Sequence, residues 1–209
     1  MNRALIISLA LVFMTGCATV ETAIESVDLD VYRSHAATVS TIDHWNLRGR
    51  ISIRAGSKGE IGRLLWVRNG DAHQLEIYGN FGSRRIRIIQ DSDGVVLEDT
   101  QGRRIIGSNM QAVLEQRTGQ SLPVEALIYW LVGAIDPKFG SVNVWDVEGR
   151  LISVQQAGWT VSFSKYRDAG GYQLPTRLNL VQDAQTLTSD ESGEKIEEIR
   201  IVISDWGIE

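Results

Sequence analysis

The stretch Trp45-Asn46-Leu47-Arg48-Gly49-Arg50-Ile51-Ser52-Ile53-Arg54 decides the fold of this 209-residue chain. Its odd positions are apolar or glycine and its even positions are polar, so the side chains alternate with a period of two. In a β-strand, successive side chains point to opposite faces of the sheet. The stretch is therefore predicted to be a strand of an antiparallel sheet, with one face in the core and the other in water.

Further strand-like runs fill most of the chain, separated by turn signals such as Asn69-Gly70-Asp71. The runs on either side of Glu148-Gly149 and of Ala157-Gly158 are typical of β-hairpins. An antiparallel sheet with many strands curls instead of staying flat. We predict a mainly β domain with some α, an incomplete antiparallel β-barrel of about eleven strands lidded by about three helices. Besides the opening stretch, strands are expected at about 60–68, 73–79, 84–90, 94–98, 103–106, 141–147, 150–157, 159–165, 175–182 and 196–204.

Three segments have the period of a helix instead. Counted along the chain, the second of these predicted helices begins at a cap formed by Ser108 or Asn109 and ends near Gly119. The third covers about 121–133. These helices are expected to fill the open side of the curled sheet. The first is expected from Leu29 to Ile42, with an apolar face formed by Val31, Tyr32, His35, Val39 and Ile42.

The concave face of such a sheet is lined by the apolar half of each strand. Its interior is either packed solid or left open as a cavity the size of a lipid, and the residues alone do not decide between these. Large tryptophan side chains are typical of a core or of a cavity wall. The candidates for an apolar cavity are Leu47, Ile51, Trp66, Leu75, Ile77, Ile86, Ile88, Trp130 and Trp145.

The N-terminus has the pattern of a secretory signal peptide. A positively charged start is followed by the apolar run Ala4 to Met14, which is too short for a membrane-spanning helix. The next residues complete Met14-Thr15-Gly16-Cys17, which resembles a bacterial lipobox, and Cys17 is the only cysteine of the chain. We therefore expect a lipoprotein signal peptide at 1–16, an acylated Cys17 with a tether at 17–28, and one domain at 29–209. The alternative is an ordinary signal peptide with an incidental cysteine.

The composition weakens several classes of function. A formal charge of −5 argues against nucleic-acid binding, which needs a basic face. The three histidines, His35, His44 and His73, have no metal-ligand spacing, so no metal site or cofactor is expected. The sequence has no Gly-x-Ser-x-Gly elbow and no phosphate loop. It therefore offers no residues that would catalyse hydrolysis. We predict a protein that is not an enzyme.

Five segments, in this order and spacing, resemble the LolB family of lipoprotein receptors of the Gram-negative outer membrane. The resemblance covers nearly all of the chain after the signal peptide, and it is carried by the segments together because none is specific alone. The segments are Trp45-Asn46-Leu47-Arg48-Gly49-Arg50-Ile51, Tyr78-Gly79-Asn80-Phe81-Gly82-Ser83, Leu122-Pro123 to Trp130-Leu131-Val132-Gly133, Leu174-Pro175-Thr176-Arg177-Leu178 and Ile201-Val202-Ile203-Ser204-Asp205-Trp206.

This resemblance implies a carrier. LolB-like proteins accept acylated lipoproteins from the periplasmic carrier LolA in an apolar cavity and place them in the outer membrane. The resemblance thus implies an outer-membrane protein, lipid-anchored through Cys17, facing the periplasm and working as a monomer without a cofactor. The residue after the anchor, Ala18, is not the aspartate that usually retains lipoproteins in the inner membrane. The open alternative is an assembly or scaffolding lipoprotein of the outer membrane that binds no acyl chain.

Phe81 is the candidate for membrane insertion. The family has a bulky apolar residue, more often leucine, that projects from a loop between two strands, and Phe81 stands at that position. Polar residues normally prevail in tight turns, so a phenylalanine between Asn80 and Gly82 suggests a bilayer as its partner. Arg84, Arg85 and Arg87 follow closely and are candidates for contact with anionic head groups. The alternative is a ring folded back onto the sheet.

Overall fold

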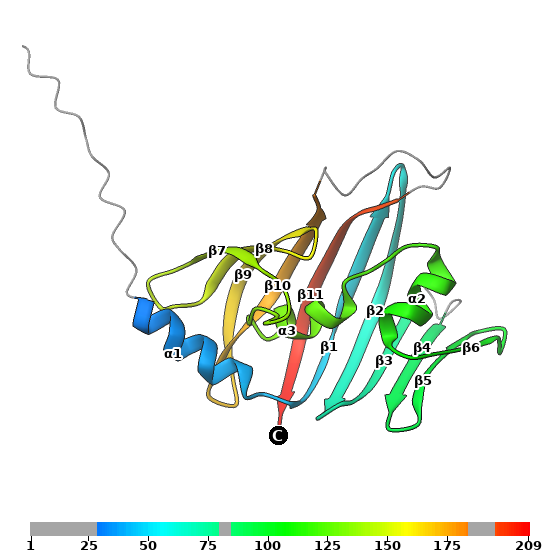
Figure 1. The fold of residues 1–209 in the computed structure, drawn as a ribbon, viewed down its shortest axis with the longest axis horizontal. Coiled ribbons are helices and arrows are strands. Elements are labelled where there is room, and N and C mark those ends of the chain that lie inside the picture. The colour runs from blue at the N-terminus through cyan, green and yellow to red at the C-terminus, as the bar shows by residue number, and fades with distance from the viewer. Residues whose placement is uncertain (1–28, 80–84, 184–194) are drawn as a thin grey trace, which may run out of the picture.

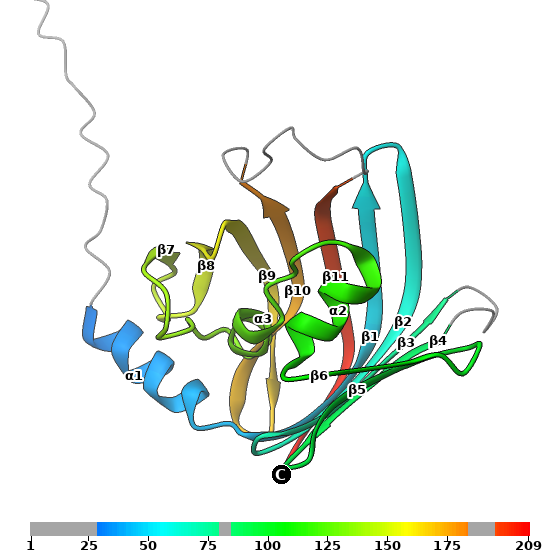
Figure 2. The ribbon, with the colours of Figure 1, turned by 45° about the vertical axis from the view of Figure 1, so that its right-hand side comes forward.

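The computed structural model describes residues 29–79, 85–183 and 195–209. Within them the chain forms one antiparallel sheet in the order β6-β5-β4-β3-β2-β1-β11-β10-β9-β8-β7, which curls without closing (Figures 1 and 2). The predicted fold class, strand number and helices are confirmed. The strands are β1 (His44–Ala55), β2 (Lys58–Asn69), β3 (Ala72–Gly79), β4 (Arg85–Asp91), β5 (Gly94–Asp99), β6 (Arg104–Gly107), β7 (Ser141–Trp145), β8 (Leu151–Gln156), β9 (Trp159–Ala169), β10 (Tyr172–Gln182) and β11 (Ile196–Ile208).

The stretch that opened the sequence analysis is β1, and it lies in the middle of the sheet between β2 and β11. Trp45, Leu47 and Ile51 are buried, while the arginines between them are exposed. Next to Gly49 the register with β11 shifts, and a Cβ at Gly49 would lie 2.3 Å from the carbonyl oxygen of Val202. Only glycine allows the two strands to approach this closely.

Two short helices, α2 (Met110–Thr118) and α3 (Val124–Leu131), lie on the concave side of the sheet (Figure 2). The predicted cap of α2 is confirmed, because the side chain of Asn109 accepts a hydrogen bond from the backbone N–H of Ala112 at 2.8 Å. Gly119 ends the helix in the left-handed conformation, with φ of 73°. The two helices close the open side of the half-barrel.

The first helix, α1 (Leu29–Ser40), lies at the margin of the sheet beside β7 to β10 (Figure 1). The predicted apolar face is buried only at its C-terminal end, through Val39 and Ile42, whereas Val31 is 37% exposed. The N-terminal part meets only strand β7, through Tyr32, and the turn after it, through Val31, so it has little surface to cover. Within the three described ranges, no helix combines the length and the apolar run needed to span a bilayer.

Side chains from the concave face of the sheet, from α2 and from α3 form one hydrophobic core. The core follows the strand alternation, with the inward residues buried and the outward residues polar or exposed. The largest fully buried side chains are Trp45, Trp66, Trp130, Leu47, Ile88, Leu97, Met110, Leu131, Leu151, Leu174, Leu180 and Ile201.

Candidate functional site

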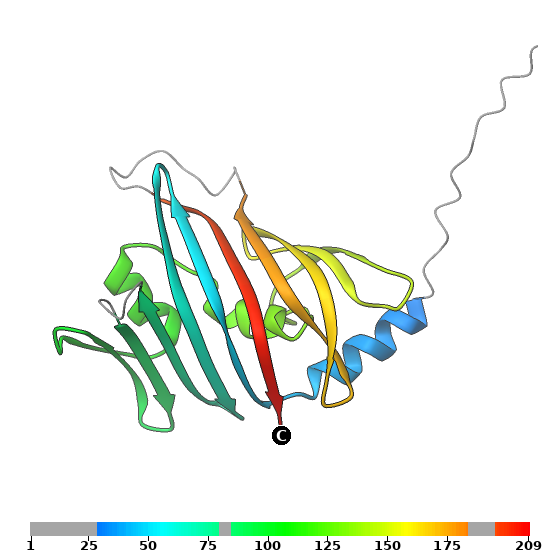
Figure 3. The same ribbon diagram turned by 180° about the vertical axis from the view of Figure 1, so that it is seen from behind.

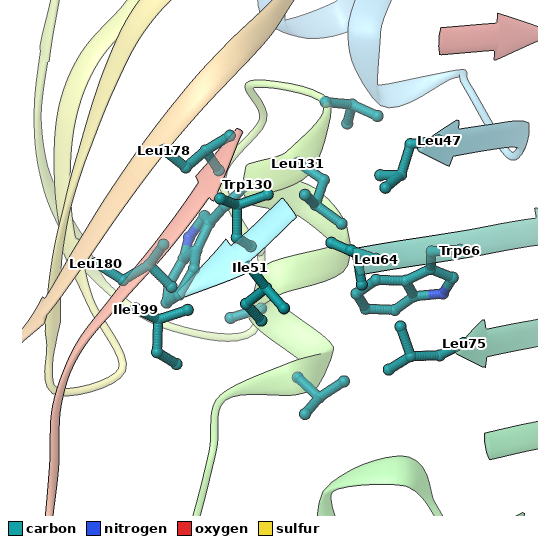
Figure 4. Packing of buried hydrophobic residues seen from close by; sticks show 14 of the residues in the cluster. Leu47, Ile51, Leu64, Trp66, Leu75, Trp130, Leu131, Leu178, Leu180 and Ile199 are labelled. Atoms are coloured by element: carbon teal, nitrogen blue, oxygen red, sulfur yellow. The ribbon is translucent and has the colours of Figure 1, made fainter. Parts of the chain in front are cut away.

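The concave interior brings together eight of the nine predicted cavity residues. Six of them are buried, and two are half-buried and pack against the same cluster. Side chains from β1, β2, β3, β10, β11 and α3 pack together in one apolar cluster (Figure 4). The buried six are Leu47, Ile51, Trp66, Leu75, Ile88 and Trp130, and the half-buried two are Ile77 and Ile86.

The ninth candidate, Trp145, lies apart from this cluster. Its ring stacks on Tyr32 of α1, with centroids 4.3 Å and planes 13° apart. The stack joins β7, at the edge of the sheet, to the first helix. The same contact is supported by Gly149, whose φ of 77° and close approach to the backbone of Val31 leave no room for a side chain. Trp145 therefore holds α1 in place.

Three tryptophans and a histidine line one end of the interior. The ring of Trp45 meets Trp66 and Trp206 edge to face, with centroids 5.8 and 5.7 Å away. Trp66 donates a hydrogen bond from Nε1 to Nδ1 of His73 at 3.3 Å. Burial, and after it the charge of Arg68, lowers the pKa of His73 to about 4. His73 is therefore neutral at neutral pH, so its ring adds no charge to this end of the interior.

A buried glutamine fastens α3 to the sheet, which the sequence did not predict. Gln156, only 2% exposed on β8, accepts hydrogen bonds from Trp130 Nε1 at 3.0 Å and from the backbone N–H of Asp136 at 3.1 Å. Its Nε2 donates to the carbonyl oxygens of Asp136, at 2.9 Å, and Phe139, at 3.0 Å. A glutamine within a strand gives no sequence signal for this role. One side chain thus ties both the helix and the loop after it to β8.

The interior is filled by protein side chains in this structure. Leu47 and Trp66 are each 1% exposed and Trp130 is fully buried. Three hollows of about 290, 240 and 400 Å³ lie elsewhere, on the outer face and beside α1, and no predicted cavity residue lines them. The described residues thus provide apolar walls and a helical cover, and an acyl-chain cavity stays a prediction.

The two residues predicted to act at a membrane, Cys17 and Phe81, lie outside the described residues. β3 and β4 pair from His73↔Gln90 to Tyr78↔Arg85, so the segment that contains Phe81 joins these two strands. Arg87, which the sequence analysis offered for head-group contact, forms an ion pair with Glu76, with Nε 3.3 Å from Oε1. Arg87 is therefore already engaged within the sheet.

The described part of the chain has a largely apolar interior and no metal cluster. No group of three histidine, cysteine or acidic side chains there is arranged to hold a metal ion. Most buried side chains of the described residues are aliphatic or aromatic, and the buried polar ones are His73, Glu76, Asp99, Asp136, Gln156 and Glu198. Such a surface suits an apolar ligand.

Comparison with known proteins defines first the class and then the family. A LolA superfamily protein from Nitrosomonas europaea superposes with a TM-score of 0.53 at 12% identity, over 85% of this chain and 93% of that one. A DUF1329 family protein from Desulfovibrio piger gives a TM-score of 0.50 at 10% identity, over 86% and 91%. These likenesses concern the fold alone, and they show that the open half-barrel is a fold found in other solved proteins.

The sequence relationship is more specific. The family model described as outer membrane lipoprotein LolB matches residues 43–206. An outer-membrane lipoprotein LolB of Pseudomonas putida is 31% identical over 179 residues, covering 86% of this chain and 82% of its own. Another, of Pseudomonas paraeruginosa, is 30% identical over 207 residues, covering 98% and 95%. The chain belongs to the LolB family, and the resemblance read from its sequence is confirmed.

Proposed function

We propose that this protein accepts acylated lipoproteins from a LolA-like periplasmic carrier and inserts them into the outer membrane, with the acyl chains held between the concave sheet and α2 and α3. The observation that carries the proposal is the lid itself. The open side of a large apolar sheet is closed by two short helices, of which α3 presents Val124, Ala126, Trp130 and Leu131 to the interior. Membership of the LolB family supports the same role.

The free energies of apolar burial are compatible with α3 acting as a lid that opens. Burying a large apolar side chain contributes about 1.5–3 kcal/mol, so lifting the buried face of α3 costs roughly 6–10 kcal/mol. An acyl chain of about sixteen carbons taken out of water contributes about 0.8 kcal/mol per methylene, or roughly 12 kcal/mol. A chain handed over from an apolar carrier gains little of this free energy, so the acyl chain offsets the opening by covering the lifted face of α3 itself. The empty protein stays closed and the loaded one is open.

Cys17 and Phe81 supply the contacts with the bilayer. An acylated Cys17 anchors the domain to the periplasmic face of the outer membrane, because several acyl chains on one residue hold a protein firmly. Phe81 enters the lipid, and the acyl chains pass from the apolar interior of the protein into the apolar core of the bilayer. The transfer between two apolar hosts is nearly neutral in free energy, so no nucleotide is needed to drive it.

The test separates acceptance from release. Residues 17–209 with Cys17→Ala, which retain every described contact, are mixed with lipoprotein-loaded carrier, and the lipoprotein that co-purifies with the soluble chain is measured. Liposomes are then added and the lipoprotein released into them is measured. Phe81→Glu should leave acceptance unchanged and reduce release more than tenfold, because a carboxylate resists insertion into lipid. Phe81→Leu should preserve both steps.

An equal loss of acceptance and release in Phe81→Glu would give the ring a role in folding instead. A second candidate function, an assembly or scaffolding lipoprotein of the outer membrane, is favoured by the filled interior. In that case the soluble chain would take up neither lipoprotein nor a fluorescent fatty acid. Uptake of either ligand decides against the scaffold.

A further inference from the structure

Four arginines lie together on the outer, convex face of the sheet, opposite the apolar interior. Arg48 and Arg50 are on β1, Arg63 is on β2 and Arg177 is on β10, and all four are exposed. The strands that carry them, together with β11, lie side by side, while α2 and α3 lie behind the sheet (Figure 3). We call these four residues the outer arginine cluster.

The sheet register brings the four close together. Arg50 pairs directly with Arg63 on one side and with Val202 on the other, and Val202 pairs in turn with Arg177. Neighbouring strands are about 4.8 Å apart, so Arg63 lies about 5 Å and Arg177 about 10 Å from Arg50 across the sheet. Arg48 is two residues along the same face, roughly 7 Å away. Like charges placed directly opposite each other destabilise a sheet.

Within the described part of the protein, no ion pair offsets this repulsion. No side chain there forms an ion pair or hydrogen bond with the guanidinium group of any of the four arginines. Asp205 is the register partner of Arg48 but does not reach ion-pair distance. The nearest acids on neighbouring strands are engaged elsewhere, Glu76 with Arg87 and Glu198 with Arg54 and Arg200.

The surroundings of the cluster suit a lipid surface better than an acidic polypeptide. Val202, which lies between Arg50 and Arg177, is 43% exposed, and Ile61 on β2 is 54% exposed. Exposed aliphatic groups among arginines on a smooth sheet match the boundary between head groups and acyl chains. Arg63 also pairs with Tyr78, one residue before β3 ends and the segment containing Phe81 begins.

We propose that the outer arginine cluster binds the anionic head groups of a phospholipid bilayer and lays the convex face of the sheet on the membrane. The phosphates neutralise the repulsion between Arg50 and Arg63. This inference rests on the proposed function only in placing the protein at a bilayer, and it does not require an acyl-chain cavity.

The test uses residues 17–209 with Cys17→Ala and co-sedimentation with two kinds of vesicle, phosphatidylcholine alone and phosphatidylcholine mixed with phosphatidylglycerol. Each arginine near an anionic surface contributes about fivefold to partitioning. The double variant Arg50→Gln/Arg63→Gln should therefore bind the mixed vesicles about 25-fold more weakly, with little change on phosphatidylcholine. The matched control is Arg33→Gln/Lys138→Gln, which removes the same charge from exposed ion pairs elsewhere and should keep binding.

The melting temperature of Arg50→Gln/Arg63→Gln should stay unchanged or rise, because a repulsive pair is removed. Acceptance of lipoprotein from the carrier without vesicles should also be unchanged, which separates this proposal from the proposed function. Equal weakening by both double variants would show that net charge alone matters, and would overturn the proposal. So would unchanged vesicle binding combined with lost binding to polyglutamate, which would assign the cluster to an acidic polypeptide.

Discussion

Replacing Gln156 with leucine tests how α3 is held on the sheet. The two side chains are similar in size, so the change removes hydrogen bonds without opening a large void. In the substituted protein Trp130 Nε1 and the backbone N–H of Asp136 lose their acceptor, and both residues are fully buried. The carbonyl oxygens of Asp136 and Phe139 lose a donor at the same time.

The expected loss of stability follows from these contacts. A buried donor left without a partner costs about 1–3 kcal/mol, so two of them lower the free energy of unfolding by about 4 kcal/mol. Domains are typically stable by only about 5–15 kcal/mol, so this is a large fraction of the total. With a urea dependence of about 2.5 kcal/mol per molar, the unfolding midpoint should fall by roughly 1.6 M.

Urea unfolding followed by circular dichroism measures this shift. The matched control is Gln155→Leu on the same strand, where the exposed side chain only bonds to Asp183 Oδ2 at 3.1 Å. It should change the free energy of unfolding by less than about 0.5 kcal/mol. If α3 is the lid, Gln156→Leu should also take up a fluorescent fatty acid faster in the absence of urea. Equal midpoints for the two variants would show that the hydrogen bonds of Gln156 do not hold α3 on the sheet.

Two further predictions concern the interior and the first helix. Burial lowers the pKa of His73 from 6.5 to about 4, so unfolding takes up a proton between these pH values. The free energy of unfolding should therefore fall by up to about 3 kcal/mol as the pH drops from 6.5 to 4. His73→Gln should flatten this part of the pH dependence of urea midpoints, and an unchanged slope would assign it to other groups. Gly149→Ala places a Cβ 2.7 Å from the carbonyl oxygen of Val31 at a φ of 77°, and should displace α1. The control Gly102→Ala has a similar φ of 74°, but its Cβ would have no atom within 4 Å. The melting temperature should therefore fall further for Gly149→Ala, and equal losses would mean that the backbone conformation alone matters.

Local patterns were enough to predict the architecture. The alternation in β1 and the glycine turns mark strands and hairpins directly, and Asn109 and Gly119 mark the ends of α2. Strand parity also assigns Leu47 and Ile51 to the concave face, because one face of each strand is buried. Antiparallel strands joined by short turns mostly pair in sequence order, so most of the sheet follows from the chain itself.

Features that depend on distant pairings were beyond the sequence. The register of β1 with β11, as in Ile51↔Ile201, sets which side chains meet on both faces of the sheet. The outer arginine cluster exists only through this register. Trp145 was placed with the cavity by its residue type, but β7 is the edge strand and its neighbour is Tyr32 of α1. Gln156 gives no pattern at all, because its role comes from the loop that packs over it.

The central claim is that acyl chains lie between the concave sheet and α3. Its most direct measurement is photolabelling with a lipoprotein whose acyl chain carries a diazirine, loaded onto residues 17–209 with Cys17→Ala and followed by peptide mass spectrometry. We expect labels on interior positions such as Leu64, Leu178 and the α3 peptide, which belong to one apolar cluster (Figure 4). Labels confined to the outer face of the sheet, with none inside, would contradict it.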